Sequence, residues 1–213
     1  MKKLLLSMIL VAFAIIAFAQ KNPAQVSDLL NRIGGEGTSS RIETRVKRSL
    51  SKDVFEISSK KGKPYIEGSS LSALTTGIGW YLNHYAHINL SWNNLTTDLS
   101  KVNLPVPQAI ERRECSAVYR YYLNYCTYSY SMAFWGEKEW QDELDWLALN
   151  GVNVVLDATA QEEVWRRFLT SIGYTHEEVL KFVAGPAYYA WAYMANLSGF
   201  GGPVHDSWFS CRT

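Results

Sequence analysis

The chain has little of what would place it in several common protein classes. Its 213 residues include three cysteines, Cys115, Cys126 and Cys211, which are too few for a fold held together by disulfides. Neither sign of charge is in excess, since 21 Lys and Arg residues balance 20 Asp and Glu residues. Nucleic acid is therefore not an expected partner. No grouping of His, Cys, Asp or Glu has the spacing of a metal site, so no metal or other cofactor is expected.

The apolar run near the N-terminus is short as well. Residues 4–18 are almost continuously apolar, but at ~1.5 Å per residue they span only about 22 Å, less than the ~30 Å hydrocarbon core of a bilayer. Two lysines precede the run, and Ala-Phe-Ala ends it at Ala19. We therefore expect residues 1–19 to be a signal peptide and the mature protein to be exported (periplasmic, extracellular or cell-surface), with no stable membrane anchor. The alternative is that the run is kept as an anchor.

Cys115 and Cys126 are not expected to form a disulfide. The residues between them are typical of an extended strand, which would hold the two Cα atoms ~30 Å apart. A disulfide requires a separation below ~7 Å, and no Gly or Pro between them favours a turn. Cys126 is therefore predicted to be a free thiol.

Residues 20–112 are expected to form a small α+β domain. "VSDLLNRIGG", residues 26–35, places apolar residues at helical spacing before a Gly-Gly stop. Two short strands, Val54–Ser58 and Pro64–Glu67, are joined by a Lys/Gly turn. "LSALTTGIGWYLNHY", residues 71–85, is predicted to be a second helix.

Three local features of this domain carry further expectations. Ser69 or Ser70 can cap the second helix. Gly77 and Gly79 inside it each cost ~1 kcal/mol relative to Ala, so we expect them to allow close packing against the sheet. "NLPVPQ", residues 103–108, is interpreted as an extended linker that leaves the domain.

After residue 112 the pattern becomes strand, helix, strand, helix. The predicted elements are a strand over 116–125, a helix over 137–151, a strand over 152–158 and helices over 160–173 and 175–183. Parallel strands linked by a crossover helix form a βαβ unit. Two such strands cannot close a barrel, so residues 113–213 are expected to be the opening βαβα portion of a truncated (β/α)8 barrel. The predicted fold class is therefore α/β, a small N-terminal α+β domain followed by this portion.

The helix over residues 137–151 is expected to be amphipathic. Its buried stripe is predicted to contain Trp140, Leu144, Leu147 and Leu149. Acidic residues in its early turns, Glu143 among them, suit the helix dipole.

Polar residues at the ends of the two predicted strands are the candidates for chemistry. In α/β barrels the working residues lie at the carboxyl ends of strands, which are Asn124 and Cys126 in the first strand and Asp157 in the second. Asp157 is either an acid/base residue or a cap for the following helix. Cys126 is either a nucleophile or a residue lining a pocket beside Asn124, and no Cys/His signature supplies a base for the first role.

Aromatic residues are abundant, above all in "YRYYLNYCTYSYS", residues 119–131. Tyr and Trp can stack on sugar rings while their polar ends bond hydroxyls, or they can pack a core. Both interpretations stay open for Tyr125, Tyr128, Tyr130 and Trp191. Core packing is preferred for Trp140, Trp146 and Trp165, which lie at helical spacing.

Four blocks of sequence, in order, resemble the α-N-acetylglucosaminidases of glycoside hydrolase family 89. They are "YRYYLNYCTYSYS", "WQDELDWLALNGVN", "QEEVW" and "GPAYYAWAYMANLSGFGGP". The resemblance implies a secreted or lysosomal exo-enzyme with a (β/α)8 catalytic domain. Such an enzyme would remove terminal α-linked N-acetylglucosamine from glycans by a retaining mechanism with two carboxyl groups ~5 Å apart.

The same resemblance assigns roles to individual residues. Asn124 and Cys126 match residues that line the sugar subsite, and Trp191 matches a pocket tryptophan. The two catalytic glutamates of the family come from later barrel strands, so no catalytic residue is assigned here. Asp157 stands where the family has an uncharged residue. We therefore expect a fragment that is inactive alone, with a glycan ending in N-acetylglucosamine and the remainder of the barrel as its partners.

Two other functions fit the sequence. One is a secreted, non-catalytic carbohydrate-binding module, which would hold a sugar on the aromatic and Asn/Cys surface. The other is one part of a split enzyme whose remainder is encoded separately.

Overall fold

The computed structural model describes residues 19–49, 52–156, 161–183 and 185, which divide into two compact units. The first unit comprises Met1–Arg120 and Gln141–Val154, and the second comprises Tyr121–Trp140 and Val155–Thr213. The chain crosses from one unit to the other within a helix. In the described ranges, no helix combines the length and the apolarity needed to cross a membrane.

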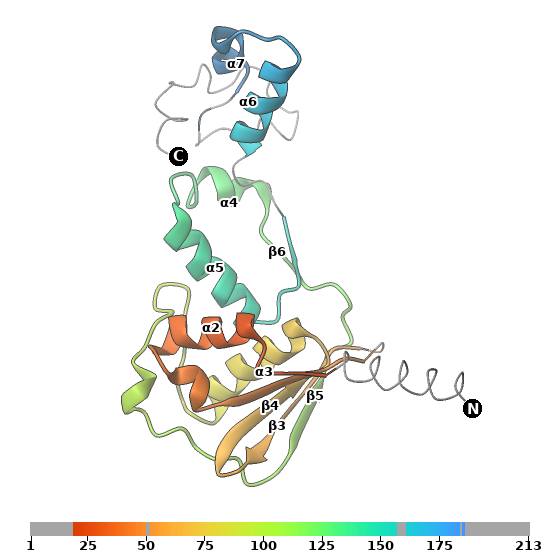
Figure 1. Cartoon of the computed structure of the whole chain (residues 1–213), viewed down its shortest axis with the longest axis vertical. Coiled ribbons are helices and arrows are strands. Elements are labelled where there is room, and N and C mark those ends of the chain that lie inside the picture. The colour runs from red at the N-terminus through yellow and green to blue at the C-terminus, as the bar shows by residue number, and fades with distance from the viewer. Residues whose placement is uncertain (1–18, 50–51, 157–160, 184, 186–213) are drawn as a thin grey trace, which may run out of the picture. The chain divides into compact units, whose positions relative to one another are not determined.

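A five-stranded mixed sheet forms the framework of the first unit (Figure 1). The strands β2 and β4 are parallel, whereas the other neighbouring strands are antiparallel. The predicted pair β3 and β4 is confirmed, and Lys61 and Gly62 join it with φ of 51° and 72°, as a tight hairpin turn requires. The order across the sheet is β1 (Ala19–Lys21), β2 (Glu43–Lys47), β4 (Lys63–Gly68), β3 (Val54–Lys60) and β5 (Glu111–Glu114).

Two helices share one hydrophobic core with this sheet. The first, α2 (Ala24–Gly34), buries four apolar side chains, and α3 (Leu71–His84) packs against β2, β3 and β4. Both helices are as predicted, and the cap of α3 is Ser70, whose hydroxyl accepts a hydrogen bond from the Ala73 N–H at 3.0 Å. Short 3-10 turns, Thr38–Ser40 and Leu99–Lys101, complete the unit. The core contains Val26, Leu29, Leu30, Ile33, Val46, Ile57, Ile66, Leu74, Ile78, Tyr81 and Leu82 among others.

The Pro-rich segment does not lead out of this unit. It runs along the core, where the Tyr81 hydroxyl donates to the Pro105 carbonyl at 2.8 Å, and then enters β5. The strand β5 pairs with β3 from Val54↔Glu114 to Ile57↔Glu111. The interpretation of residues 103–108 as an exit linker is therefore wrong, because the chain returns to the sheet.

The two glycines of α3 contact different neighbours. A Cβ at Gly77 would lie 2.9 Å from Ile66 Cγ2, so Gly77 packs on the sheet as predicted. A Cβ at Gly79 would lie 2.2 Å from the carbonyl oxygen of Leu149. The neighbour of Gly79 is thus the backbone at the end of α5 (Glu137–Leu149), and the expectation of a sheet contact there is wrong.

Arg120 connects three separate segments of the first unit. Its Nη2 donates to Asp53 Oδ2 at 2.5 Å and to Ser72 Oγ at 3.1 Å. Its Nε donates to the carbonyl oxygen of Gly151 and its Nη1 to that of Ala117, the latter at 2.9 Å. One guanidinium therefore joins the start of β3, the first turn of α3 and the loop after α5.

The partners of Arg120 are themselves held by further hydrogen bonds. Partial burial raises the pKa of Asp53, but hydrogen bonds from Ser70 and Arg120 outweigh this effect and hold the pKa below its ordinary value. Asn153 accepts from the Arg120 N–H at 2.8 Å and donates to the Val118 carbonyl at 2.9 Å. Asn153 thus ties the loop after α5 to residues 118–120.

The buried face of α5 differs from the predicted stripe. Leu144 is 48% exposed, whereas Glu143 and Asp145 are buried. Asp145 receives two hydrogen bonds from Arg32, both 2.7 Å long, and Glu143 accepts one from Trp92 Nε1. Burial raises the pKa of Glu143, and the Trp92 bond opposes that shift. Specific polar pairs, rather than apolar burial alone, therefore set the orientation of this helix.

The second unit contains short elements. The strands β6 (Tyr121–Tyr122) and β7 (Val154–Val155) form a two-stranded sheet, with β7 lying at the division between the units. The strands predicted over 116–125 and 152–158 are therefore much shorter within the described residues. The described helices that lie wholly in the second unit are α4 (Tyr125–Ser129), α6 (Gln161–Ser171) and α7 (His176–Phe182). The predicted capping box of α7 is confirmed, since Thr175 and Glu178 bond each other's backbone N–H.

Gly79→Ala is expected to destabilise the first unit. The added methyl group would meet the Leu149 backbone, which cannot move aside as a side chain can, and overpacking of this kind costs about 1–3 kcal/mol. The matched control is Gly77→Ala in the same helix, whose new Cβ would meet the side chains of Ile66 and Phe55. Urea unfolding followed by circular dichroism should give the lower midpoint for Gly79→Ala. Equal midpoints would contradict the close approach.

Candidate functional site

Asn124 begins a helix instead of ending a long strand. Leu123 is buried with φ of 78°, which turns the chain sharply after β6. Asn124 then has extended backbone, and its Oδ1 accepts from the Thr127 N–H at 3.2 Å and from the Thr127 hydroxyl at 3.1 Å. Asn124 is therefore the N-cap of α4, and the prediction that the strand runs on through Tyr125 is wrong.

The amide of Asn124 keeps binding capacity after this capping bond. The residue is exposed, and within the described part of the chain its Nδ2 donates no hydrogen bond. Cys126 is half-buried two positions further on, where the first turn of α4 orients it. The two sequence-predicted residues therefore lie two positions apart on one short turn.

Cys126 has the surroundings of a contact residue. Among the described residues, Cys115 and Cys126 form no disulfide, as predicted for Cys126, and no hydrogen bond joins Cys126 to a histidine. A nucleophilic cysteine needs such a base nearby. Within the described residues the nucleophilic role therefore has no histidine base, and the pocket-lining role stays a prediction.

An aromatic cluster supports this turn. Tyr128 is 1% exposed, stacks on Trp140 with ring centroids 5.6 Å apart, and donates its hydroxyl to the carbonyl oxygen of Leu156. Trp135 meets Trp140 edge-on at 5.2 Å. Tyr128 is consequently a core residue, and the bond to Leu156 joins α4 to the residue that directly precedes Asp157.

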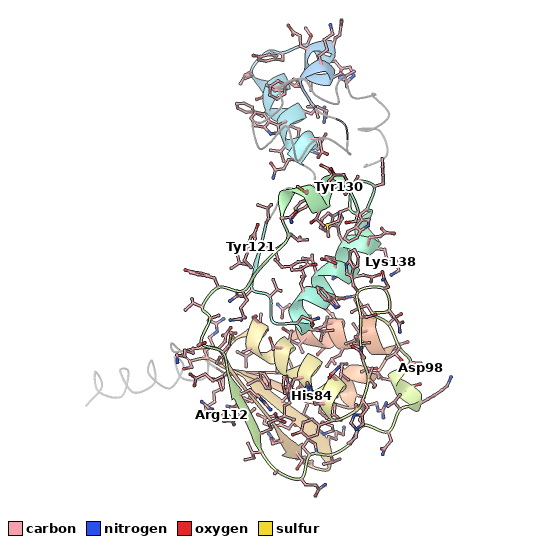
Figure 2. All side chains as sticks on the ribbon, turned by 180° about the vertical axis from the view of Figure 1, so that it is seen from behind. His84, Asp98, Arg112, Tyr121, Tyr130 and Lys138 are labelled. Carbon is pink, nitrogen blue, oxygen red and sulfur yellow. The ribbon has the colours of Figure 1, made fainter. Side chains whose placement is uncertain are left out.

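Other aromatic residues of the tyrosine-rich stretch face solvent. Tyr121 and Tyr130 are 58% and 73% exposed, and both project outward in Figure 2. Val118 and Tyr119, which fall within the strand predicted over residues 116–125, are 68% and 79% exposed. The predicted strand is wrong at these two residues, because β6 begins only at Tyr121.

Two of the sequence-predicted positions lie outside the described residues. They are Trp191, assigned to the sugar pocket, and Asp157, the candidate acid/base or cap. In the ranges that are described, no group of three or more His, Cys, Asp or Glu side chains is placed to hold a metal ion.

Neither the capping role of Asn124 nor the anchoring role of Tyr128 was predicted from the sequence. The signal for the cap was present, since Asn is among the best N-cap residues and a helix can start wherever one occurs. It was outweighed by six nearby tyrosines, a residue type that is frequent in strands. The bond from Tyr128 to Leu156 spans 28 residues, so no local pattern could reveal it.

Comparison with known proteins gives two family matches in chain order. Residues 24–106 match the model described as Alpha-N-acetylglucosaminidase (NAGLU) N-terminal domain. Residues 120–213 match the Alpha-N-acetylglucosaminidase (NAGLU) tim-barrel domain. The architecture described above is therefore an N-terminal domain followed by the start of a TIM barrel.

Individual relatives agree with these matches. Human alpha-N-acetylglucosaminidase is 32% identical over 197 residues, which are 88% of this chain and 26% of the human protein. A family 89 glycoside hydrolase from Clostridium perfringens, solved with 2-acetamido-1,2-dideoxynojirmycin, is 37% identical with a TM-score of 0.73. The match covers 90% of this chain and 22% of that one. A variant of the Clostridium perfringens enzyme in complex with its substrate GlcNAc-alpha-1,4-galactose has a TM-score of 0.74. The chain spans about a quarter of the length of these relatives.

Asn124→Ala is expected to loosen α4, whereas Asn124→Asp should preserve it. Loss of an N-cap costs about 1 kcal/mol, roughly a fivefold change in local opening, and Asp caps as well as Asn. Hydrogen exchange of the Thr127 amide, which Asn124 binds, measures this directly. The Glu178 amide, capped independently by Thr175, is the internal control and should not change in either variant. Slow Thr127 exchange in Asn124→Ala would show that the cap does not hold α4.

Proposed function

Because the chain belongs to the α-N-acetylglucosaminidase family, glycoside hydrolase family 89, we propose that it is the N-terminal portion of an exo-acting glycosidase. The whole enzyme would hydrolyse terminal α-linked N-acetylglucosamine from glycans. The observation that carries the proposal is the ordered match of the N-terminal domain over 24–106 and the barrel domain over 120–213. The complex of the Clostridium perfringens relative with GlcNAc-alpha-1,4-galactose supports the substrate class.

In this proposal the chain supplies part of the sugar subsite. Asn124 presents a donor amide from the start of α4, and Cys126 lines the same turn. Trp191 is proposed as the pocket tryptophan. A neutral, hydrogen-bonding surface with an aromatic face suits a sugar, whose hydroxyls need partners and whose C–H face is apolar.

The proposed chemistry is a retaining hydrolysis by two carboxyl groups. One protonates the leaving oxygen and later activates water, while the other attacks the anomeric carbon to form a glycosyl-enzyme intermediate. In the family these glutamates belong to later barrel strands. We therefore propose that the 213-residue chain binds and orients the sugar without cleaving it, and that turnover requires the remainder of the barrel.

An exposed apolar stripe along α6 supports a further partner. Val164 and Phe168 lie on α6, and Ile172 directly follows its last residue with its N–H bonded to the Phe168 carbonyl. The three residues are four positions apart and are 60%, 50% and 56% exposed. Residues at this spacing share one helix face, and an apolar face of this kind is normally covered. In a (β/α)8 barrel the helices pack against the strands, so further barrel segments are the partner we propose for this stripe. This observation favours a split or longer enzyme over a self-contained carbohydrate-binding module.

The isolated chain is expected to show no turnover of an aryl α-N-acetylglucosaminide, because both catalytic carboxylates are supplied elsewhere. The measurement is release of the aryl alcohol, compared with the buffer rate. Two variants make the test sharp: Asp157→Asn removes the acidic candidate of the second strand, and Asp28→Asn is a matched change at an exposed site on α2. Turnover that Asp157→Asn abolishes and Asp28→Asn leaves intact would overturn the proposal.

Export with cleavage after Ala19 is the localisation that we propose. The support is the basic, apolar and small-residue order of residues 1–19. In a bacterial host, intact mass and N-terminal sequencing of the exported protein should identify Gln20 as the first residue. Recovery of the uncleaved chain in the membrane fraction would instead support the anchor alternative.

A further inference from the structure

The first unit contains a cavity that belongs to neither the Asn124 turn nor the predicted barrel chemistry. It has a volume of about 380 Å³, within the range of small-molecule sites. It lies against the last turns of α3, with the loop over residues 88–90 on one side and Leu149 and Asn150 at the end of α5 on the other. Every residue that lines it belongs to the first unit.

The lining of the cavity is uncharged. None of the described residues that line it carries a carboxylate, an ammonium or a guanidinium group. An ionic ligand would lose its hydration without gaining a counter-ion, and this is costly. The cavity therefore suits a neutral ligand.

An aromatic platform forms one wall. The ring of His84 stacks on Trp80 with centroids 3.7 Å apart and planes 10° from parallel, while Arg113 lies 4.3 Å from the Trp80 ring. His84 is exposed and is the last residue of α3 (Figure 2). Its Nδ1 lies 3.1 Å from the Trp80 carbonyl oxygen, which can only accept, so Nδ1 carries a proton. In the neutral ring Nε2 is then an acceptor for a ligand.

Side-chain amides supply further hydrogen-bonding groups. Asn83 and Asn89 are exposed, and in the described part of the chain neither amide takes part in a hydrogen bond. Asn150 donates through Nδ2 to the Trp146 carbonyl at 2.8 Å, which leaves its Oδ1 as an acceptor. Donors and acceptors are thus both available around the cavity.

Apolar side chains complete the lining. Leu82 and Leu149 are buried, and Ile88 and Leu90 are half-buried beside them. A purely apolar ligand would strip water from the three amides without replacing it. A ligand with both an apolar face and several hydroxyl or amide groups can pack on the apolar side chains and form hydrogen bonds with the amides.

We propose that this cavity is a second saccharide-binding site, which takes a neutral sugar of one or two rings. The sugar's C–H face packs on the apolar lining and the His84 ring, and its hydroxyl groups bond Asn83, Asn89 and His84 Nε2. The geometry of the cavity is independent of the proposed hydrolase activity, and only the choice of N-acetylglucosamine as the probe rests on it.

Titration of the complete 213-residue chain with N-acetylglucosamine tests the proposal. In ¹H–¹⁵N spectra the side-chain amide signals of Asn83 and Asn89 should shift saturably, with millimolar affinity. Asn83→Ala and Asn89→Ala should each weaken binding about tenfold, the effect of one good hydrogen bond. Galacturonate, a charged sugar, should produce no saturable shift.

Two controls separate this site from others. Asn94→Ala changes an exposed asparagine of the same loop that does not line the cavity, and it should leave the affinity unchanged. Asn124→Ala should leave the shifts at Asn83 and Asn89 intact. Loss of those shifts in Asn124→Ala, equal effects of Asn83→Ala and Asn94→Ala, or no saturable shift at either amide would each overturn the second site. None of these outcomes bears on the hydrolysis assay, so the two proposals fail separately.

Discussion

The organisation of the first unit depends on the hydrogen bonds and the ion pair that the Arg120 guanidinium forms. The guanidinium is mostly buried, and its donors reach the start of β3 through Asp53, the first turn of α3 through Ser72 and the loop after α5 through Gly151. A buried guanidinium is stable only when its donors are paired, so all these segments must be in place together. Arginine suits this position because its planar fork can address several oxygens at once.

The beginning of the barrel sequence is therefore built onto the N-terminal domain. The last turns of α5 lie against α3, where the absence of a side chain at Gly79 admits the Leu149 carbonyl. Arg32 of α2 binds Asp145 of α5 through two hydrogen bonds, although the residues are 113 positions apart. These contacts place the boundary of the compact unit inside α5, away from the Pro-rich segment that composition alone suggests.

The two proposed sugar-binding surfaces share one chemical character. The Asn124 turn presents an amide and a thiol over a core of Tyr128 and Trp140, and the cavity of the first unit presents amides and a histidine ring over leucines. Neither depends on charge, which agrees with the near-neutral composition of the chain. Neutral, hydrogen-bonding surfaces backed by apolar groups are suited to uncharged sugars.

Local patterns predicted the helices well. The spacing of apolar residues and the caps at Ser70 and Thr175 depend on neighbours a few positions away, so α2, α3, α5, α6 and α7 follow from the sequence. Ordered motifs likewise identified the family. Strands β2 and β5 were missed because "ETRVK" and "ERRE" are rich in charge, and only pairing across the sheet stabilises them.

Only the tertiary structure decided which polar residues are buried and which neighbour packs against each glycine of α3. The burial of Glu143 and Asp145 depends on Trp92 and Arg32, which lie 51 and 113 residues away in the chain. The position of Asn124 as a helix cap depends on a turn at Leu123 that local strand propensity opposes. The sequence by itself determined α2, α3, α5, α6 and α7, the family and the near-neutral charge of the chain. Packing between distant segments determined the contacts that position them, because such contacts leave no periodic signal in the chain.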